Sequence, residues 1–184
     1  MINVVTEATP NPATLKFIPG CAVMEAGTVN FASSGMAERS PLALRLFAID
    51  GVKGVFFGAD FVSIAKSAAA DWRVLAPSVS AGIEAHFESG DLVVLFDEER
   101  GADEDEKDDP VVSQIKDLLD ARIRPSVAVD GGDIVYRRFE HGVVYLSLQG
   151  ACLDCPSSSA TLKMGVENLL KYYVSDVIRV EAIE

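Results

Sequence analysis

The chain has 184 residues, of which 49% are hydrophobic and 24% are charged, a balance typical of one large globular domain or two small ones. Its formal net charge of -12 argues against nucleic-acid binding, because contact with phosphates needs a basic surface. No apolar run approaches the roughly 18 residues of a membrane-spanning helix, so no membrane role is expected.

The N-terminal part, residues 1–96, predicts a small α+β domain. Asp71 is a candidate N-cap for an amphipathic helix, because Leu75, Val79 and Ile83 recur behind it at helical spacing. The other expected elements, in chain order, are a strand at 15–18, a helix at 42–47, a hairpin of strands 52–57 and 61–65 around Gly58, and a closing strand at 92–96.

An acidic stretch follows at residues 97–109, with nine acidic and two basic side chains. It has no apolar periodicity, and a block of like charges favours a solvated, flexible chain over a packed element. We therefore expect a linker here, between a first domain at residues 1–96 and a second at residues 110–184.

The C-terminal part predicts the order helix, strand, strand, helix, strand. Asp109-Pro110 is typical of a helix start, and Arg124-Pro125 is expected to end that helix, since the residue before proline avoids helical angles. The remaining expectations are a turn at Asp130–Asp133, strands at 134–139 and 143–148, a helix at 157–173, and a strand at 177–183 with Ile178, Val180 and Ala182 facing inward. This order predicts an α+β fold in which both helices cover one face of a mixed sheet.

Two thiols, Cys152 and Cys155, lie three positions apart between the second of these strands and the next helix. Amides in the first turn of that helix are expected to lower the thiol pKa values and favour thiolates. A redox cysteine and a soft-metal ligand both need a thiolate, so this feature does not separate the two. The third cysteine, Cys21, has no nearby partner and is expected to be structural or incidental, and the odd count favours a reducing compartment.

The number of ligands limits how the two thiols could bind a metal, because a tetrahedral zinc site or a [4Fe–4S] cluster takes four protein ligands. His86 and His141 are not at ligand spacing and are expected to be surface residues. Three interpretations remain: an iron–sulfur cluster shared by two copies of the chain, a zinc ion shared by two copies, and a dithiol-disulfide oxidoreductase. The last is disfavoured because a hairpin precedes the thiols and because Asp154 between them would raise thiol pKa values.

Motifs in the C-terminal part resemble the Nfu domain, the C-terminal scaffold domain of NifU-type iron–sulfur proteins. The resemblance covers residues 110–184, and Asp154 departs from the small residue that is usual in the family. The motifs are Ile123-Arg124-Pro125, Asp130-Gly131-Gly132-Asp133 and Gly150-Ala151-Cys152 through Cys155-Pro156-Ser157-Ser158. Residues 1–96 resemble the Nfu N-terminal domain through Thr9-Pro10-Asn11-Pro12, Lys16-Phe17, Ser40-Pro41-Leu42-Ala43 and Phe56-Phe57-Gly58.

The resemblance implies a carrier and not an enzyme. It implies that Cys152 and Cys155 bind a [4Fe–4S] cluster held between two protomers, so that the chain is a homodimer when the cluster is bound. Its partners would be upstream cluster-assembly proteins and apo iron–sulfur target proteins. The expected location is the bacterial cytoplasm, with the mitochondrial matrix as the alternative.

Overall fold

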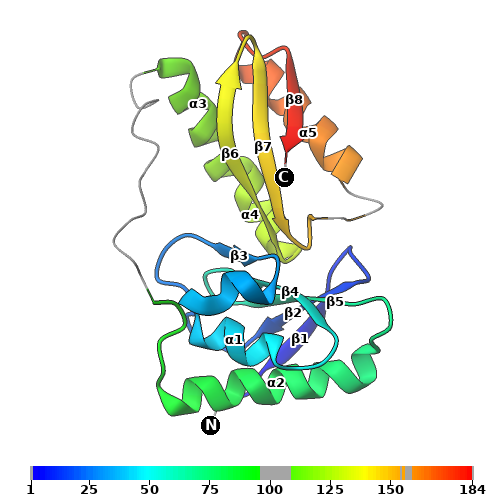
Figure 1. The fold of residues 1–184 in the computed structure, drawn as a ribbon. Helices are drawn as coiled ribbons and strands as arrows, with labels where there is room; N and C mark the ends of the chain where they lie inside the picture. The colour runs from blue at the N-terminus through cyan, green and yellow to red at the C-terminus, as the bar shows by residue number, and fades with distance from the viewer. Residues whose placement is uncertain (1, 96–108, 154, 156–158, 184) are drawn as a thin grey trace. The chain divides into compact units, whose positions relative to one another are not determined.

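The computed structural model describes residues 2–95, 109–153, 155 and 159–183. The chain divides into two compact units, residues 1–96 and 97–184, which are described separately (Figure 1). The expected linker lies outside the described residues except for Asp109. No helix in the described part of the chain combines the length and the apolarity needed to cross a membrane.

The N-terminal unit contains a five-stranded sheet in the order β1-β2-β5-β4-β3, in which every neighbouring pair is antiparallel. Its strands are β1 (Val5–Ala8), β2 (Thr14–Ile18), β3 (Val29–Phe31), β4 (Val52–Phe57) and β5 (Val62–Lys66). The predicted strand at 15–18 and the predicted hairpin are confirmed. Sequence patterning missed β1 and β3, because every residue of β1 is exposed and β3 has only three residues.

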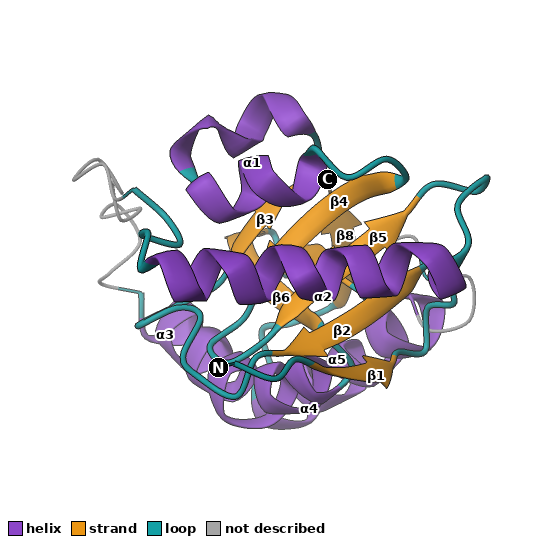
Figure 2. Ribbon diagram, turned by 90° about the horizontal axis from the view of Figure 1, so that it is seen from below, coloured by secondary structure: helices purple, strands orange, loops and turns teal. Residues whose placement is uncertain are grey.

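Two helices lie across one face of this sheet, α1 (Pro41–Phe47) and α2 (Trp72–Ser89) (Figure 2). Each begins at a polar N-cap: the Ser40 hydroxyl accepts from the Ala43 amide at 3.0 Å, and the Asp71 carboxylate accepts from the Arg73 amide at 2.9 Å. The apolar stripe of α2 packs into the core as predicted. A short 3-10 helix at Ser34–Arg39 precedes α1.

The closing strand expected at residues 92–96 is wrong for its described part, residues 92–95. The Leu95 amide donates to the carbonyl of Arg39 at 2.7 Å, and the Val93 carbonyl accepts from the Ser40 hydroxyl. Two backbone groups of the segment are thus bonded to Arg39 and Ser40, just before α1, and the segment is not a strand. A short apolar run in the sequence does not distinguish these two outcomes.

The C-terminal unit contains the predicted mixed sheet, in the order β6-β7-β8. Strands β6 (Gly132–Glu140) and β7 (Val143–Gly150) form an antiparallel hairpin, and β8 (Arg179–Ile183) pairs with β7 in parallel. The hairpin turn has positive φ angles at His141 (50°) and Gly142 (78°), as tight two-residue turns require. Helix α5 (Ser159–Tyr173) makes the crossover between the parallel strands.

Helix α3 (Pro110–Leu118) starts where predicted, with the Asp109 carboxylate accepting from the Val111 amide at 2.8 Å. The prediction that Arg124-Pro125 ends the helix is wrong. A π-helical turn at Leu119–Ile123 leads directly into α4 (Arg124–Val129). Pro125 stands in the first turn of α4, and the wider π turn before it accommodates the proline ring.

The helices pack on one face of the sheet, as expected of the fold class. Ile115, Leu119 and Val127 of the helical segment meet Val166 and Leu170 of α5 over the strands, together with Ile134, Val144, Leu146 and Val180. One detail differs. Of Ile178, Val180 and Ala182, which were expected to face inward, only Val180 is buried. Ile178 lies before β8, donates its amide to the Gly142 carbonyl at 2.7 Å and is 64% exposed, and Ala182 is also exposed.

Candidate functional site

Cys152 and Cys155 lie directly after β7 in a tightly folded turn. Gly150 has a φ of 62°, and the Leu153 amide donates to its carbonyl at 3.1 Å. Both side chains are buried, with 5% of Cys152 and 1% of Cys155 exposed, and no disulfide joins these two described residues. The turn therefore presents two reduced thiols at the end of the central strand.

Gly132 makes room for the first thiol. A Cβ atom at this position would lie 2.5 Å from the Cys152 sulfur and 2.8 Å from the Gln149 carbonyl oxygen, closer than real atoms approach. The Ala151 amide also donates to the carbonyl of Gly131, at 3.1 Å. The two glycines of the Asp130–Asp133 motif thus allow the start of β6 to lie against the cysteine turn.

An ion pair holds the start of β6 to the helical segment. The Arg124 guanidinium donates to both carboxylate oxygens of Asp133, at 2.9 and 2.8 Å, and to Asp120 at 3.0 Å. Asp133 is 3% exposed and also accepts from the Ile134 amide at 2.8 Å. These hydrogen bonds raise the pKa of Arg124, so it stays charged.

This pairing corrects the prediction for Asp130–Asp133. Asp130 and Gly131 form a turn, but Gly132 and Asp133 belong to β6. Asp133 is a structural residue that sequence reasoning missed, because nothing in the chain indicates that a carboxylate nine positions after Arg124 is buried against it.

The electrostatics of Cys152 are opposite to the expectation. Burial, together with the carboxylate of Asp130, the neighbouring Cys155 and the carboxylate of Asp133, raises the pKa of its thiol to about 12. The described part of α5 starts at Ser159, and the expected contributions of Asp154, Pro156, Ser157 and Ser158 lie outside the described residues. Cys152 is therefore a protonated thiol at neutral pH when no metal is bound, and metal binding must displace its proton.

The described residues of one chain offer an incomplete ligand set. Within the described residues, no three side chains of His, Cys, Asp or Glu are grouped so that they could hold a metal ion. His141 is exposed in the β6–β7 turn, and the partly exposed Cys21 and the buried His86 belong to the N-terminal unit. Among the described residues, the two thiols thus lack the further ligands that a four-coordinate site takes.

His86 was expected at the surface, and that is wrong. It is fully buried, and neither ring nitrogen has a hydrogen-bond partner among the described residues. Burial lowers its pKa, with a further contribution from Arg45, so it is neutral at physiological pH. The sequence carries no signal that tells whether a histidine late in an amphipathic helix is buried or exposed.

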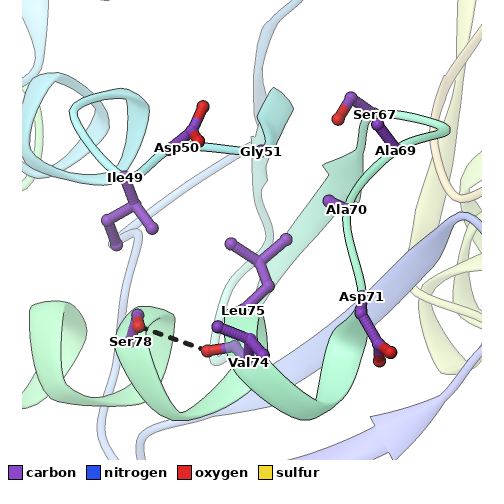
Figure 3. A pocket seen from close by; sticks show the side chains of 10 residues that line it. All are labelled: Ile49, Asp50, Gly51, Ser67, Ala69, Ala70, Asp71, Val74, Leu75 and Ser78. Carbon is purple, nitrogen blue, oxygen red and sulfur yellow. Dashed lines mark hydrogen bonds between the residues drawn. The ribbon is translucent and has the colours of Figure 1, made fainter.

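The N-terminal unit also has a pocket of about 380 Å³ beside the start of α2 (Figure 3). The Asp71 carboxylate at its edge already binds the Arg73 guanidinium, at 2.6 Å, and the Ser78 hydroxyl donates to the Val74 carbonyl at 3.2 Å. The ten labelled lining residues include neither cysteine nor histidine. This pocket therefore has no ligand for a soft metal.

Comparison with known proteins relates both units to one family. The family model "Scaffold protein Nfu/NifU N terminal" matches residues 4–90, and the model "NifU-like domain" matches residues 115–181. The human protein "NFU1 iron-sulfur cluster scaffold homolog, mitochondrial" is 49% identical over 179 residues, which cover 97% of this chain and 70% of the human protein.

The protein of the same name from Drosophila erecta is 51% identical over 181 residues, and the matched region is 97% of this chain but only 64% of the fly protein. Among solved structures, the NMR structure of a NifU-like protein from Saccharomyces cerevisiae matches with a TM-score of 0.48 and 22% identity, over 53% of this chain and 87% of the yeast chain.

Proposed function

The chain belongs to the Nfu/NifU family of iron–sulfur cluster scaffold proteins, and from this premise we propose that it carries a [4Fe–4S] cluster between two copies, each of which contributes Cys152 and Cys155. The observation that supports this most directly is the incomplete ligand set: two buried, reduced thiols at the end of β7. A two-fold axis beside this turn doubles the set to four thiolates.

The cluster is cargo in this proposal. Upstream cluster-assembly proteins supply it, and apo iron–sulfur proteins receive it when their own thiolates replace those of Cys152 and Cys155 one at a time. The high pKa of the Cys152 thiol favours release, because the vacated sulfur takes up a proton and does not remain as a buried thiolate. The chain thus acts as a carrier and needs no catalytic residue.

The alternative, a dithiol-disulfide oxidoreductase, has less support. Its attacking cysteine must ionise near neutral pH, whereas burial and two carboxylates oppose ionisation of Cys152. The names of the human and Drosophila erecta relatives place those two proteins in mitochondria. We propose a reducing compartment for this chain, either the mitochondrial matrix or the bacterial cytoplasm, since both keep thiols reduced.

Anaerobic reconstitution with iron and sulfide tests the proposal. The expected product is a dimer with about four irons per two chains and a broad absorption band near roughly 400 nm from thiolate-ligated iron. Cys152→Ser and Cys155→Ser should each abolish both the band and the dimer, whereas Cys21→Ser should retain them.

A colourless wild-type monomer whose thiols cycle with a dithiol reductant would contradict the carrier proposal and favour the oxidoreductase. A colourless dimer with one zinc ion would favour a zinc-bridged interaction module. Dimer size and metal content should be measured on the same eluted peak.

A further inference from the structure

The outer face of α5 has unusually little charge for this chain. Its residues Thr161, Gly165, Asn168 and Tyr172 recur every three or four positions and are all exposed, so they form one stripe along the helix. Met164 and Tyr172 are 64% and 81% exposed.

The charged side chains of α5 pair within the unit. Lys171 donates to Glu167 at 2.7 Å and Lys163 donates to Glu181 at 3.0 Å. Of the three charged residues of α5, a helix described throughout, Lys171 has the most exposed side chain. The stripe itself is uncharged.

A groove of about 580 Å³ runs beside this stripe, between α5 and the helical segment that contains Arg122. Gly165 keeps it open, since a Cβ atom there would meet nothing within 4 Å. Among the described residues that line it, Arg122 alone is charged, and its guanidinium lies 5.3 Å from the centre of the Tyr173 ring. The rest of the lining is largely apolar: Ile123, Ser126, Thr161, Leu162, Gly165, Val166 and Leu169.

The groove begins close to the thiols along the chain. Helix α5 starts at Ser159, four residues after Cys155, and Gly165 follows about 9 Å further along the helix axis. If two copies share one cluster, the first turns of their α5 helices lie near each other, because α5 starts only four residues after Cys155. A two-fold axis that runs along these helices places them side by side in parallel.

From these observations we infer that the occupant of the groove is a second copy of this chain: the two α5 helices pair in parallel along the stripe, and Met164 of each copy enters the groove beside Gly165 of the other. The inference rests on the proposed shared cluster.

Charge favours this occupant. Two chains that each carry a net charge of -12 repel each other, so a contact between them is most favourable where unpaired charge is absent. A flexible methionine side chain suits an irregular apolar groove.

The test compares Gly165→Glu with Ser113→Glu. Both add one carboxylate to an exposed helical position of the same unit, but Ser113 lies on α3 outside the groove and the stripe. In the monomer a Cβ atom at position 165 would meet no other atom within 4 Å, and glutamate is a better helix former than glycine.

The dimer dissociation constant of reconstituted protein is measured anaerobically by sedimentation velocity. We expect it to rise at least about tenfold for Gly165→Glu, which corresponds to one contact of moderate strength at an interface, and to stay within about twofold of wild type for Ser113→Glu.

Each outcome of this experiment either supports or overturns the inference. A Gly165→Glu protein that forms the cluster-bearing dimer as tightly as wild type overturns the inference and leaves the carrier proposal intact. A wild-type protein that yields neither cluster nor dimer overturns both. If thermal unfolding shows that Gly165→Glu does not fold, Met164→Ala takes its place, with an expected weakening of about fivefold; an unchanged constant for that variant also overturns the inference.

Discussion

The sulfur of Cys152 is the atom whose surroundings matter most to this site. It lies against the backbone of β6 at Gly132, is 5% exposed, and faces the charges of Asp130 and Asp133. These surroundings favour the neutral thiol over the thiolate, because the negative charge of a thiolate would lose its hydration on burial and would also be repelled by the carboxylates. A thiol without metal is thus inert, and a metal-bound thiolate has its charge compensated by the metal.

This leads to a pH-dependent prediction for the cluster-free protein. Because the pKa of Cys152 is raised to about 12, its thiolate fraction should stay small at pH 8 and increase about tenfold with each pH unit up to about 11. Alkylation by iodoacetamide, followed by mass spectrometry of the Cys152 peptide, measures this. Equal rates for Cys152 and the partly exposed Cys21 at pH 8 would contradict it.

Gly132→Ala is the matched structural variant for that experiment. Its added Cβ atom would lie 2.5 Å from the Cys152 sulfur, so the sulfur must move out of its buried position and react faster. Gly35→Ala is the control, because the nearest atom to an added Cβ there is the Ser33 hydroxyl oxygen at 3.9 Å.

The helical segment and β6 depend on each other through Arg124 and Asp133. The π turn at Leu119–Ile123 lets the helix continue into α4, and α4 then presents Arg124 to the first residues of β6. Without the ion pair, a nearly buried carboxylate would remain in the unit beside the cysteine turn. The pair therefore couples the two elements that support the thiols.

Arg124→Ala should destabilise the C-terminal unit by about 2 kcal/mol, below the 3–5 kcal/mol typical when a fully buried pair is broken, because the arginine itself is 35% exposed. Urea unfolding followed by circular dichroism measures this. Arg179→Ala is the control, since Arg179 pairs with Glu181 at 3.5 Å and is 58% exposed, so the expected loss is below about 0.5 kcal/mol. Equal losses for both variants would contradict a structural role of the Arg124 pair.

The whole chain is strongly acidic, and residues 97–109 alone contain nine of its 28 acidic side chains. A dimer of two such chains forms against long-range repulsion, which salt screens over a distance of roughly 10 Å at 0.1 M ionic strength. Overall charge thus opposes the association that the shared cluster requires.

We therefore expect the dimer dissociation constant of the reconstituted protein to fall several-fold when sodium chloride rises from about 0.02 to 0.2 M, measured by sedimentation velocity. Replacing Asp103, Glu104, Asp105 and Glu106 by their amides should reduce this salt effect. A dimer that weakens with added salt would instead indicate that opposite charges meet across the interface.

Local patterns allowed part of the fold to be predicted. The α2 stripe, the β4–β5 and β6–β7 hairpins and the Asp109 cap depend on residues close in sequence, whose spacing and turn chemistry act before any tertiary contact forms. Strands β1 and β3 were not predictable in this way, because an exposed or very short strand is defined by its neighbours in the sheet.

The sequence by itself determined the family, the α+β class and the position of the two thiols, because spacing and motif order are properties of the linear chain. Tertiary structure alone decided that the helix continues past Arg124-Pro125, that Asp133 and His86 are buried, and that the Cys152 pKa is raised and not lowered. Burial and the charges that surround a side chain arise only when distant segments pack together, and they shift a pKa more strongly than sequence neighbours do.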